Sequence, residues 1–178
     1  SDNHRDLILS QLPAPGLMLE WGSRGTTEWL LERLKPSQRL VSIEHATRWA
    51  SEVMALCSHY PNWTMLRVPS SLEVGANATH WEECPAGLTG YITRPEAAEA
   101  DVILIDGVAR GACLAWACAV AKADAVIYLH DVQEVRAGWY DWALHLPRIN
   151  HVRVVKHDGT YPALLAEIRL RDGKVLQI

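Results

Sequence analysis

The sequence predicts an α/β protein with a doubly wound, mostly parallel sheet that ends in an antiparallel hairpin. Three observations support this fold class. Short apolar runs alternate with amphipathic helical stretches up to residue 146, four of these runs end in an acidic residue, and Asp-Gly turns separate the apolar runs after residue 150. Alternating β-α-β units give a parallel sheet with right-handed crossovers. Asp-Gly between apolar runs indicates a hairpin.

Length and charge limit the classes of partner. The chain has 178 residues and a formal net charge of −4, which fits one domain over residues 1–178. Because no dense Lys/Arg tract is present, we expect no nucleic-acid partner. We also expect no membrane partner and no secretory signal, because no apolar run reaches about 18 residues. A cytoplasmic location is therefore expected, and a homo-oligomer is left open.

The four cysteines show neither a CxxC pair nor zinc-type spacing to histidines. We interpret them as buried or free thiols in a reducing compartment.

The first part of the chain is predicted to form three β-α units behind an N-terminal segment, 1–15. Within that segment a helix over 4–12 ends at Pro13 and Pro15. Trp49, Val53, Leu56 and Tyr60 recur at steps of three and four residues, which is typical of an amphipathic helix. The predicted elements are strand 17–21, helix 26–34, strand 39–44, helix 46–60 and strand 63–68.

Residues 69–100 are predicted to form a long loop with a helical turn at 96–100. A loop of this length in a compact domain is usually functional or contains a helix. Trp81 and Tyr91 lie within it. Two interpretations stay open for them: contacts of a lid or substrate, and hydrophobic pegs that pin the loop to the body.

The second part of the chain predicts two further β-α units and the hairpin. Asp158-Gly159 and Asp172-Gly173 mark its turns. The predicted elements are strand 101–106, helix 110–122, strand 125–130, helix 135–146, and terminal strands 151–156, 163–170 and 174–178.

Four predicted strands deliver an acidic residue to one edge of the sheet. Ligands of open parallel sheets bind outside the carboxyl ends of the strands, near the point where strand order reverses. Singly, each acid is interpreted as a helix cap or a solvated turn residue. Together they suit a cationic ligand. The four are Glu20, Glu44, Asp106 and Asp131.

A tight turn with Gly22 and Gly25 follows the first strand. Glycine permits a sharp turn and a close approach to a ligand, and free amides at the start of the next helix would face that ligand. Glu44, about twenty residues further on, is placed to accept hydrogen bonds from a ribose diol. The third glycine of a G-x-G-x-x-G motif is absent, which disfavours a nicotinamide dehydrogenase.

Three segments contain the glycine turn or the acidic strand ends: residues 19–27, 101–110 and 128–132. They resemble motifs of class I S-adenosylmethionine-dependent methyltransferases, in particular a branch of small members. Leu19-Glu-Trp-Gly-Ser-Arg-Gly-Thr-Thr27 resembles their first motif. The run from Asp101 to Arg110 resembles their fourth motif, and the run from Tyr128 to Val132 their fifth-strand ending. The resemblance covers residues 16–146 and implies a Rossmann-like, seven-stranded sheet. Cys84, Leu88 and Pro95 also resemble glucuronoxylan 4-O-methyltransferases.

The resemblance implies S-adenosylmethionine as cofactor and O-methylation of a small-molecule or saccharide acceptor. It places Glu20, Gly22, Ser23 and Gly25 around the methionine part of the cofactor. Further expected contacts are Glu44 with the ribose and His45 beside it, the segment 70–72 with Ser71 at the adenine, and Asp106 at the methyl group.

Asp106, His130 and Asp131 are the candidate bases for an oxygen acceptor, since a histidine beside an aspartate has a pKa near working pH. The histidine is alternatively a cap of the strand end. Arg110 either binds an acidic acceptor or holds Asp106 and Asp131 in place. Metal-dependent catechol-type members carry Asp-Asn where this chain has Asp131-Val132, so no metal is expected.

One departure from the family lies in the glycine turn. Arg24 stands where the family commonly has glycine, and a positive φ there would cost about 1–2 kcal/mol. Alternatively, Arg24 pairs with the carboxylate of the cofactor. The departure leaves open a second function, a non-catalytic module on the same fold that binds the cofactor or a partner.

Overall fold

A single sheet of seven strands organises the chain. The structure, a computed structural model, describes residues 2–70, 85–133, 137–156 and 164–171. The strand order is β3-β2-β1-β4-β5-β7-β6, in which the first five strands are parallel, β7 pairs antiparallel with β5, and β6 pairs antiparallel with β7. The strands are β1 (Gly16–Trp21), β2 (Gln38–Glu44), β3 (Trp63–Arg67), β4 (Val102–Ile105), β5 (Val126–His130), β6 (Ile149–Lys156) and β7 (Leu164–Leu170). The predicted fold class is confirmed.

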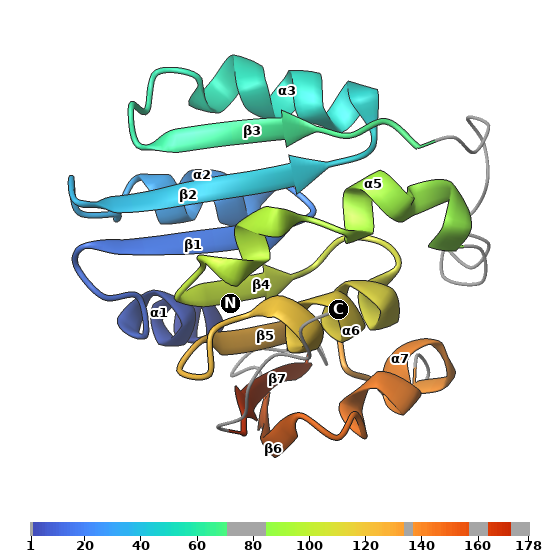
Figure 1. The fold of residues 1–178 in the computed structure, drawn as a ribbon. Helices are drawn as coiled ribbons and strands as arrows, with labels where there is room; N and C mark the ends of the chain where they lie inside the picture. The colour runs from blue at the N-terminus through green and yellow to red at the C-terminus, as the bar shows by residue number, and fades with distance from the viewer. Residues whose placement is uncertain (1, 71–84, 134–136, 157–163, 172–178) are drawn as a thin grey trace.

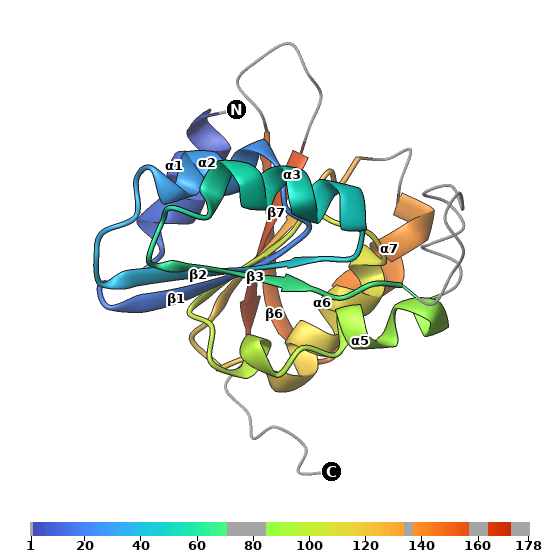
Figure 2. The same ribbon diagram turned by 90° about the horizontal axis from the view of Figure 1, so that it is seen from above.

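Helices cover both faces of the sheet. Helices α1, α2 and α3 lie on one face, and α5, α6 and α7 on the other (Figures 1 and 2). The helices are α1 (Asp2–Ser10), α2 (Gly25–Leu31), α3 (Thr47–Cys57), α5 (Thr89–Ile92), α6 (Arg110–Val120) and α7 (Ala137–Leu144), with 3-10 turns η1 (Pro85–Leu88) and η2 (Pro95–Ala98).

Alternation along the strands divides the core into two apolar clusters. In β1, Leu19 and Trp21 belong to the cluster that includes residues of α5, α6 and α7, whereas Met18 belongs to the cluster that includes residues of α1, α2 and α3. Successive strand side chains point to opposite faces, so this division follows from the pleat. Glu20 therefore points to the same face as Met18.

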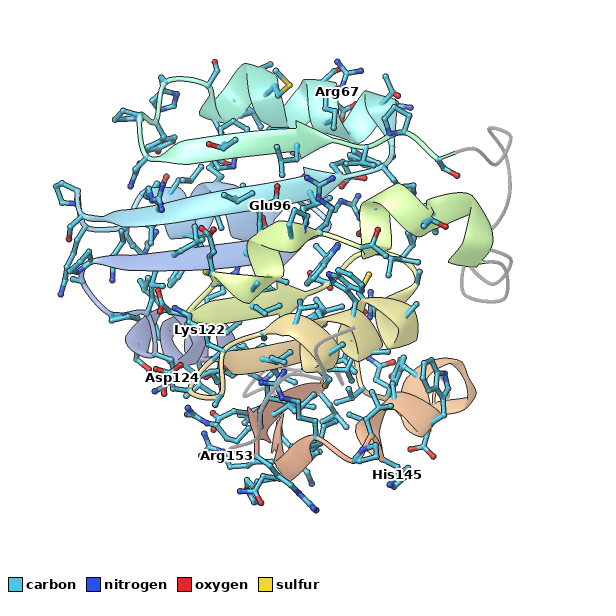
Figure 3. All side chains as sticks on the ribbon, viewed as in Figure 1. Arg67, Glu96, Lys122, Asp124, His145 and Arg153 are labelled. Atoms are coloured by element: carbon cyan, nitrogen blue, oxygen red, sulfur yellow. The ribbon has the colours of Figure 1, made fainter. Side chains whose placement is uncertain are left out.

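An ion pair fixes the edge of the sheet where the parallel strands begin. Asp101 accepts a hydrogen bond from the Leu17 amide at 2.7 Å and pairs with Lys122. Figure 3 shows Lys122 at this edge, away from the arrowheads. Burial alone raises the pKa of Asp101, but the bonds from Lys122 and Leu17 outweigh it and hold the pKa below its ordinary value.

The loop predicted over 69–100 contains short helices in its described part. The expected helical turn at 96–100 appears as η2, one residue earlier. Tyr91 of α5 is only 1% exposed, so it is a hydrophobic peg. Trp81, Cys84, Ser71 and residues 172–178 lie outside the described residues.

The expectations for the cysteines and for membrane-spanning helices can be compared with the described residues. Cys57, Cys113 and Cys118 are buried, as one of the two interpretations of the cysteines expects. Among the described helices, none has the length and hydropathy needed to cross a membrane.

Candidate functional site at the carboxyl edge of the sheet

The strand order places the candidate residues along the carboxyl edge of the parallel strands, which we call the rim. Strand β1 lies between β2 and β4, so the chain order reverses between β1 and β4. The β1 and β4 ends are tied together, because the Asp106 amide donates to the Trp21 carbonyl at 2.9 Å. Glu44, Glu20, Asp106 and His130 therefore follow one another along the carboxyl edge of four adjacent strands. This is the position at which such sheets bind ligands.

Two glycines allow the loops after β1 and β4 to touch. Gly22 has φ +87°, and a Cβ on it would lie 2.5 Å from the Gly107 Cα. A Cβ on Gly107 would in turn meet the Tyr91 hydroxyl. Both positions therefore require glycine. Gly25 differs, since a Cβ there would meet nothing within 4 Å and its position faces open space.

The expected strain at Arg24 is absent. Its φ of −163° is extended backbone, which any residue adopts, so the cost predicted for a positive φ does not arise. The backbone holds this shape because the Arg24 amide donates to Thr27 Oγ1 at 3.1 Å. The Arg24 guanidinium stacks on the Trp49 ring at 4.1 Å from the ring centroid. Its pairing with a cofactor carboxylate stays a prediction.

Glu44 closes the turn after β1 from the neighbouring strand. Its Oε2 accepts hydrogen bonds from the Ser23 amide at 2.9 Å and the Ser23 hydroxyl at 3.2 Å, and its Oε1 from the Ala46 amide at 2.8 Å. The His45 Nδ1 lies 3.1 Å from Oε1. Burial alone raises the pKa of Glu44, but these donors outweigh it and lower the pKa. Glu44 is thus a charged acceptor whose lone pairs are shared with Ser23.

Glu20 has the opposite environment. It is fully buried, and its Oε2 accepts from the Thr27 hydroxyl at 2.7 Å and the Ser42 hydroxyl at 2.8 Å. Burial raises its pKa to about 8, against these hydrogen bonds and with the help of the Asp106 and Glu44 charges. At neutral pH the Glu20 carboxyl is therefore mostly neutral, and it ties the start of α2 to β1 and β2. Its Oε1 has no hydrogen-bond partner among the described residues.

His130 lies between two carboxylates. Its Nδ1 is 3.0 Å from Asp106 Oδ1 and 3.3 Å from Asp131 Oδ1. Burial alone lowers the pKa of His130, but the hydrogen bonds and charges of these two aspartates outweigh it and raise the pKa to about 9. The sequence predicted a pKa near working pH, which is wrong for this arrangement, because the imidazole is mostly protonated at pH 7.

Arg110 links the loops after β4 and β5. Its Nε donates to the Gly107 carbonyl and its Nη1 to the His130 carbonyl, both at 2.8 Å. The guanidinium also lies 3.3 Å from Asp131 Oδ2 and 3.6 Å from Asp106 Oδ1. Two roles were considered for Arg110, and these contacts favour the second, in which Arg110 holds Asp106 and Asp131 in place.

Backbone strain accumulates on both sides of this linkage. Asp131 has φ +59° and Ala109, directly before Arg110, has φ +49°. Non-glycine residues rarely adopt such values, which persist where surrounding contacts enforce them. The Tyr140 hydroxyl and the Gln133 amide both donate to the Asp131 carbonyl. The strained backbone keeps the Asp131 side chain turned toward His130.

Asp106, His130 and Asp131 each offer a ligand atom within 4.8 Å of the others, so this group has the spacing to hold a metal ion. The Arg110 guanidinium already lies against both carboxylates. Two negative groups are thus balanced by an imidazolium and a guanidinium. The sequence predicted a rim of four negative charges, but the neutral Glu20 and this balance make the rim less negative than expected.

The outcomes differ between the predicted site residues. The structure gathers Glu20, Gly22, Ser23, Glu44 and His45 at the first two strand ends and Asp106, Arg110, His130 and Asp131 at the next two, while Ser71 lies outside the described residues. The sequence interpretation missed Thr27 and Ser42, which bond Glu20. Strand alternation places Ser42 beside Glu20 in register and could have identified it.

Comparison of the whole structure with solved structures identifies the fold. Similar structures include an rRNA methylase from Streptococcus thermophilus (TM-score 0.60, 8% identity, covering 94% of both chains). A precorrin-6y C5,15-methyltransferase from Geobacter metallireducens matches with TM-score 0.63, 15% identity and coverage of 95% of this chain and 88% of that one. The O-methyltransferase TomG from Streptomyces achromogenes, in complex with SAM, matches with TM-score 0.62, 16% identity and coverage of 96% and 81%.

The sequence itself matches no family model and no curated protein. The resemblance to glucuronoxylan 4-O-methyltransferases therefore stays a prediction. The chain has the seven-stranded fold shared by these methyltransferases.

Replacement of Glu20 by glutamine tests the buried neutral carboxyl. Folding binds a proton at Glu20 between its ordinary pKa of 4.5 and its folded pKa of about 8. The contribution of Glu20 to the free energy of unfolding is therefore fully present below pH 4.5. It falls by up to about 1.4 kcal/mol per pH unit as the pH rises, and it is lost once the pH has passed through 8. We expect Glu20→Gln to remove this share of the pH dependence. Denaturant unfolding of both proteins from pH 5 to 8 measures it, and parallel curves would contradict a neutral Glu20.

Proposed function

We propose that the protein is an S-adenosylmethionine-dependent methyltransferase acting on an oxygen of a small molecule or saccharide. The observation that carries the proposal is the meeting of the Gly22 turn, Glu44 and Asp106 at the reversal point of a methyltransferase fold. Similar structures carry rRNA, carbon and oxygen methyltransferase names, so the fold alone does not select the acceptor.

The residues at the turn fit the cofactor. The unpartnered Glu20 Oε1 would accept a hydrogen bond from the ammonium group, and the open space at Gly25 leaves room for the methionine part. Glu44 would accept from the ribose hydroxyls in place of the Ser23 hydroxyl, whose present bond of 3.2 Å is longer than the 2.9 Å bond from the Ser23 amide. S-adenosylmethionine supplies an electrophilic methyl group for an in-line displacement.

The cluster at β4 and β5 fits the handling of a proton from the acceptor. Asp106 and Asp131 hold the Nδ1 side of His130, and Nδ1 is buried. The side chain is 26% exposed, so part of the ring other than the buried Nδ1 reaches solvent. A neutral His130 would accept the acceptor's proton at Nε2, while Arg110 keeps both aspartates in place. The alternative, a module without turnover, is favoured by the raised pKa of His130, since its protonated form cannot act as a base.

Calorimetry on Gly25→Ala tests where the cofactor lies. A new methyl group meets no protein atom, so the unfolding free energy should stay equal or rise by up to about 1 kcal/mol. If the cofactor packs on Gly25, its binding should weaken by about 1–3 kcal/mol. Gly138→Ala in α7 is the matched control, since a Cβ there also meets nothing. Wild-type protein that binds neither S-adenosylmethionine nor S-adenosylhomocysteine would reject the proposal.

Glu44→Ala should weaken binding of S-adenosylhomocysteine by about 1–3 kcal/mol, the scale of a lost charged hydrogen bond. Glu32→Ala serves as the control, because it removes a carboxylate that pairs with Arg33 at the far end of α2. Its affinity should be unchanged. Equal affinities of the wild type and Glu44→Ala would show that Glu44 does not hold the ribose.

The proposed role of His130 predicts the pH dependence of turnover. Because the pKa of His130 is raised to about 9, the fraction of His130 that is neutral and can act as a base increases about tenfold per pH unit below that value. Methyl transfer to an acceptor found by screening hydroxylated small molecules and saccharides should rise correspondingly between about pH 6 and 8. His130→Ala should lose this rise and most turnover, with cofactor affinity nearly intact. A flat wild-type profile would assign the base elsewhere.

A further inference from the structure

The N-terminal helix carries a buried histidine toward the candidate site. His4 is 2% exposed, and the apolar side chains at steps of four after it, Ile8 and Leu12, are 2% and 6% exposed. Residues four apart lie on one face of a helix, so His4 and Ile8 form a buried stripe on α1, and Leu12, which follows the helix end at Ser10, is buried in the same apolar cluster as Ile8. Ile8 and Leu12 belong to the same apolar cluster as Val126 and Tyr128 of β5.

The direction of the chain decides where His4 lies. Helix α1 ends at Ser10, and β1 begins at Gly16 on the edge of the sheet where the parallel strands start. The helix therefore runs against the parallel strands (Figure 1), and its first turn points toward their carboxyl ends. There the His4 ring meets the His130 ring at the end of β5, with a centroid separation of 6.2 Å and an interplanar angle of 85°. This edge-to-face geometry is a favoured one for two aromatic rings.

Further contacts fix the helix at both ends. The Arg5 guanidinium lies 5.7 Å from the centroid of the Trp29 ring in α2. Near the end of the helix, Gln11 Oε1 accepts a hydrogen bond from Arg169 of β7 at 2.8 Å. Contacts to α2 and β7, together with the buried stripe, make the placement of His4 a property of the packed helix.

We propose that His4 is a positioning residue for His130. The aspartates hold only the Nδ1 side of the imidazole, and the χ2 torsion of histidine has a broad, roughly two-fold potential. The edge-to-face contact with His4 blocks rotation of the His130 ring and keeps Nδ1 toward Asp106 and Asp131. This proposal rests on the proposed function for its consequence in proton transfer, but the ring contact can be tested without turnover.

Side-chain ¹H–¹⁵N NMR of the full chain supplies the test. A His130 Nδ1–H bonded to carboxylates should give a downfield signal that exchanges slowly with water, and His130→Gln assigns it by its disappearance. His4→Leu keeps most of the buried volume and removes the ring, so the signal should broaden or vanish. His4→Phe keeps a ring, so the signal should persist. Ile8→Val, one turn along the same stripe, is the matched control and should leave the signal unchanged.

The outcomes separate this proposal from the proposed function. An unchanged signal in His4→Leu, its loss in His4→Phe, or its absence from the wild type would overturn the role of His4. His4→Met provides a second ring-free variant should the leucine variant not fold. Calorimetry of the wild type with S-adenosylmethionine is independent: absent binding together with a ring-dependent signal would reject the methyltransferase and retain the role of His4.

Discussion

The close approach of the loops after β1 and β4 is the constraint on which the site depends. Gly22 and Gly107 lie so near that a side chain on either would collide with the other loop or with Tyr91. This contact places the ends of two neighbouring strands side by side where the chain order reverses. Glu44 can then reach the Ser23 amide from the next strand. A wider gap would leave the same acidic residues on the sheet without a common turn to organise them.

The hydrogen-bond donors and charges around each acid, more than its burial, determine what it can do at this rim. Glu20 and Glu44 are both buried, at 0% and 5% exposure, yet their pKa values move in opposite directions. Glu44 meets His45 and the amides of Ser23 and Ala46, which together stabilise the carboxylate enough to offset burial. Glu20 meets two hydroxyls and the charges of neighbouring carboxylates, which leave burial dominant. At Asp106 and Asp131 the charge is instead balanced by Arg110 and His130.

The sequence predicted which acidic residues share the carboxyl edge of the sheet, but it did not predict the protonation states of the residues there. Apolar runs ending in acids predict that Glu20, Glu44 and Asp106 share an edge, because parallel strands all end on one side. The pKa of His130 depends on two aspartates that meet its Nδ1, one of them 24 positions earlier in the chain, and sequence spacing does not encode that geometry. The strain expected at Arg24 was inferred from a family pattern, whereas the extended backbone follows from the hydrogen bond to Thr27. For His4 a signal existed: a helix that leads into the first strand must begin near the carboxyl edge.

In the proposed function, two carboxyls with separated pKa values divide the work of binding a positively charged nucleoside. A charged acceptor suits neutral hydroxyl donors, because it accepts without exchanging a proton, and Glu44 has this character. A neutral buried carboxyl beside the glycine turn becomes an anion when a cation arrives, since the cation offsets the desolvation that raised its pKa. Under this proposal, Glu20 keeps an uncompensated charge out of the core until the cofactor's cation is present. The same division explains how a rim rich in acids coexists with a stable sheet.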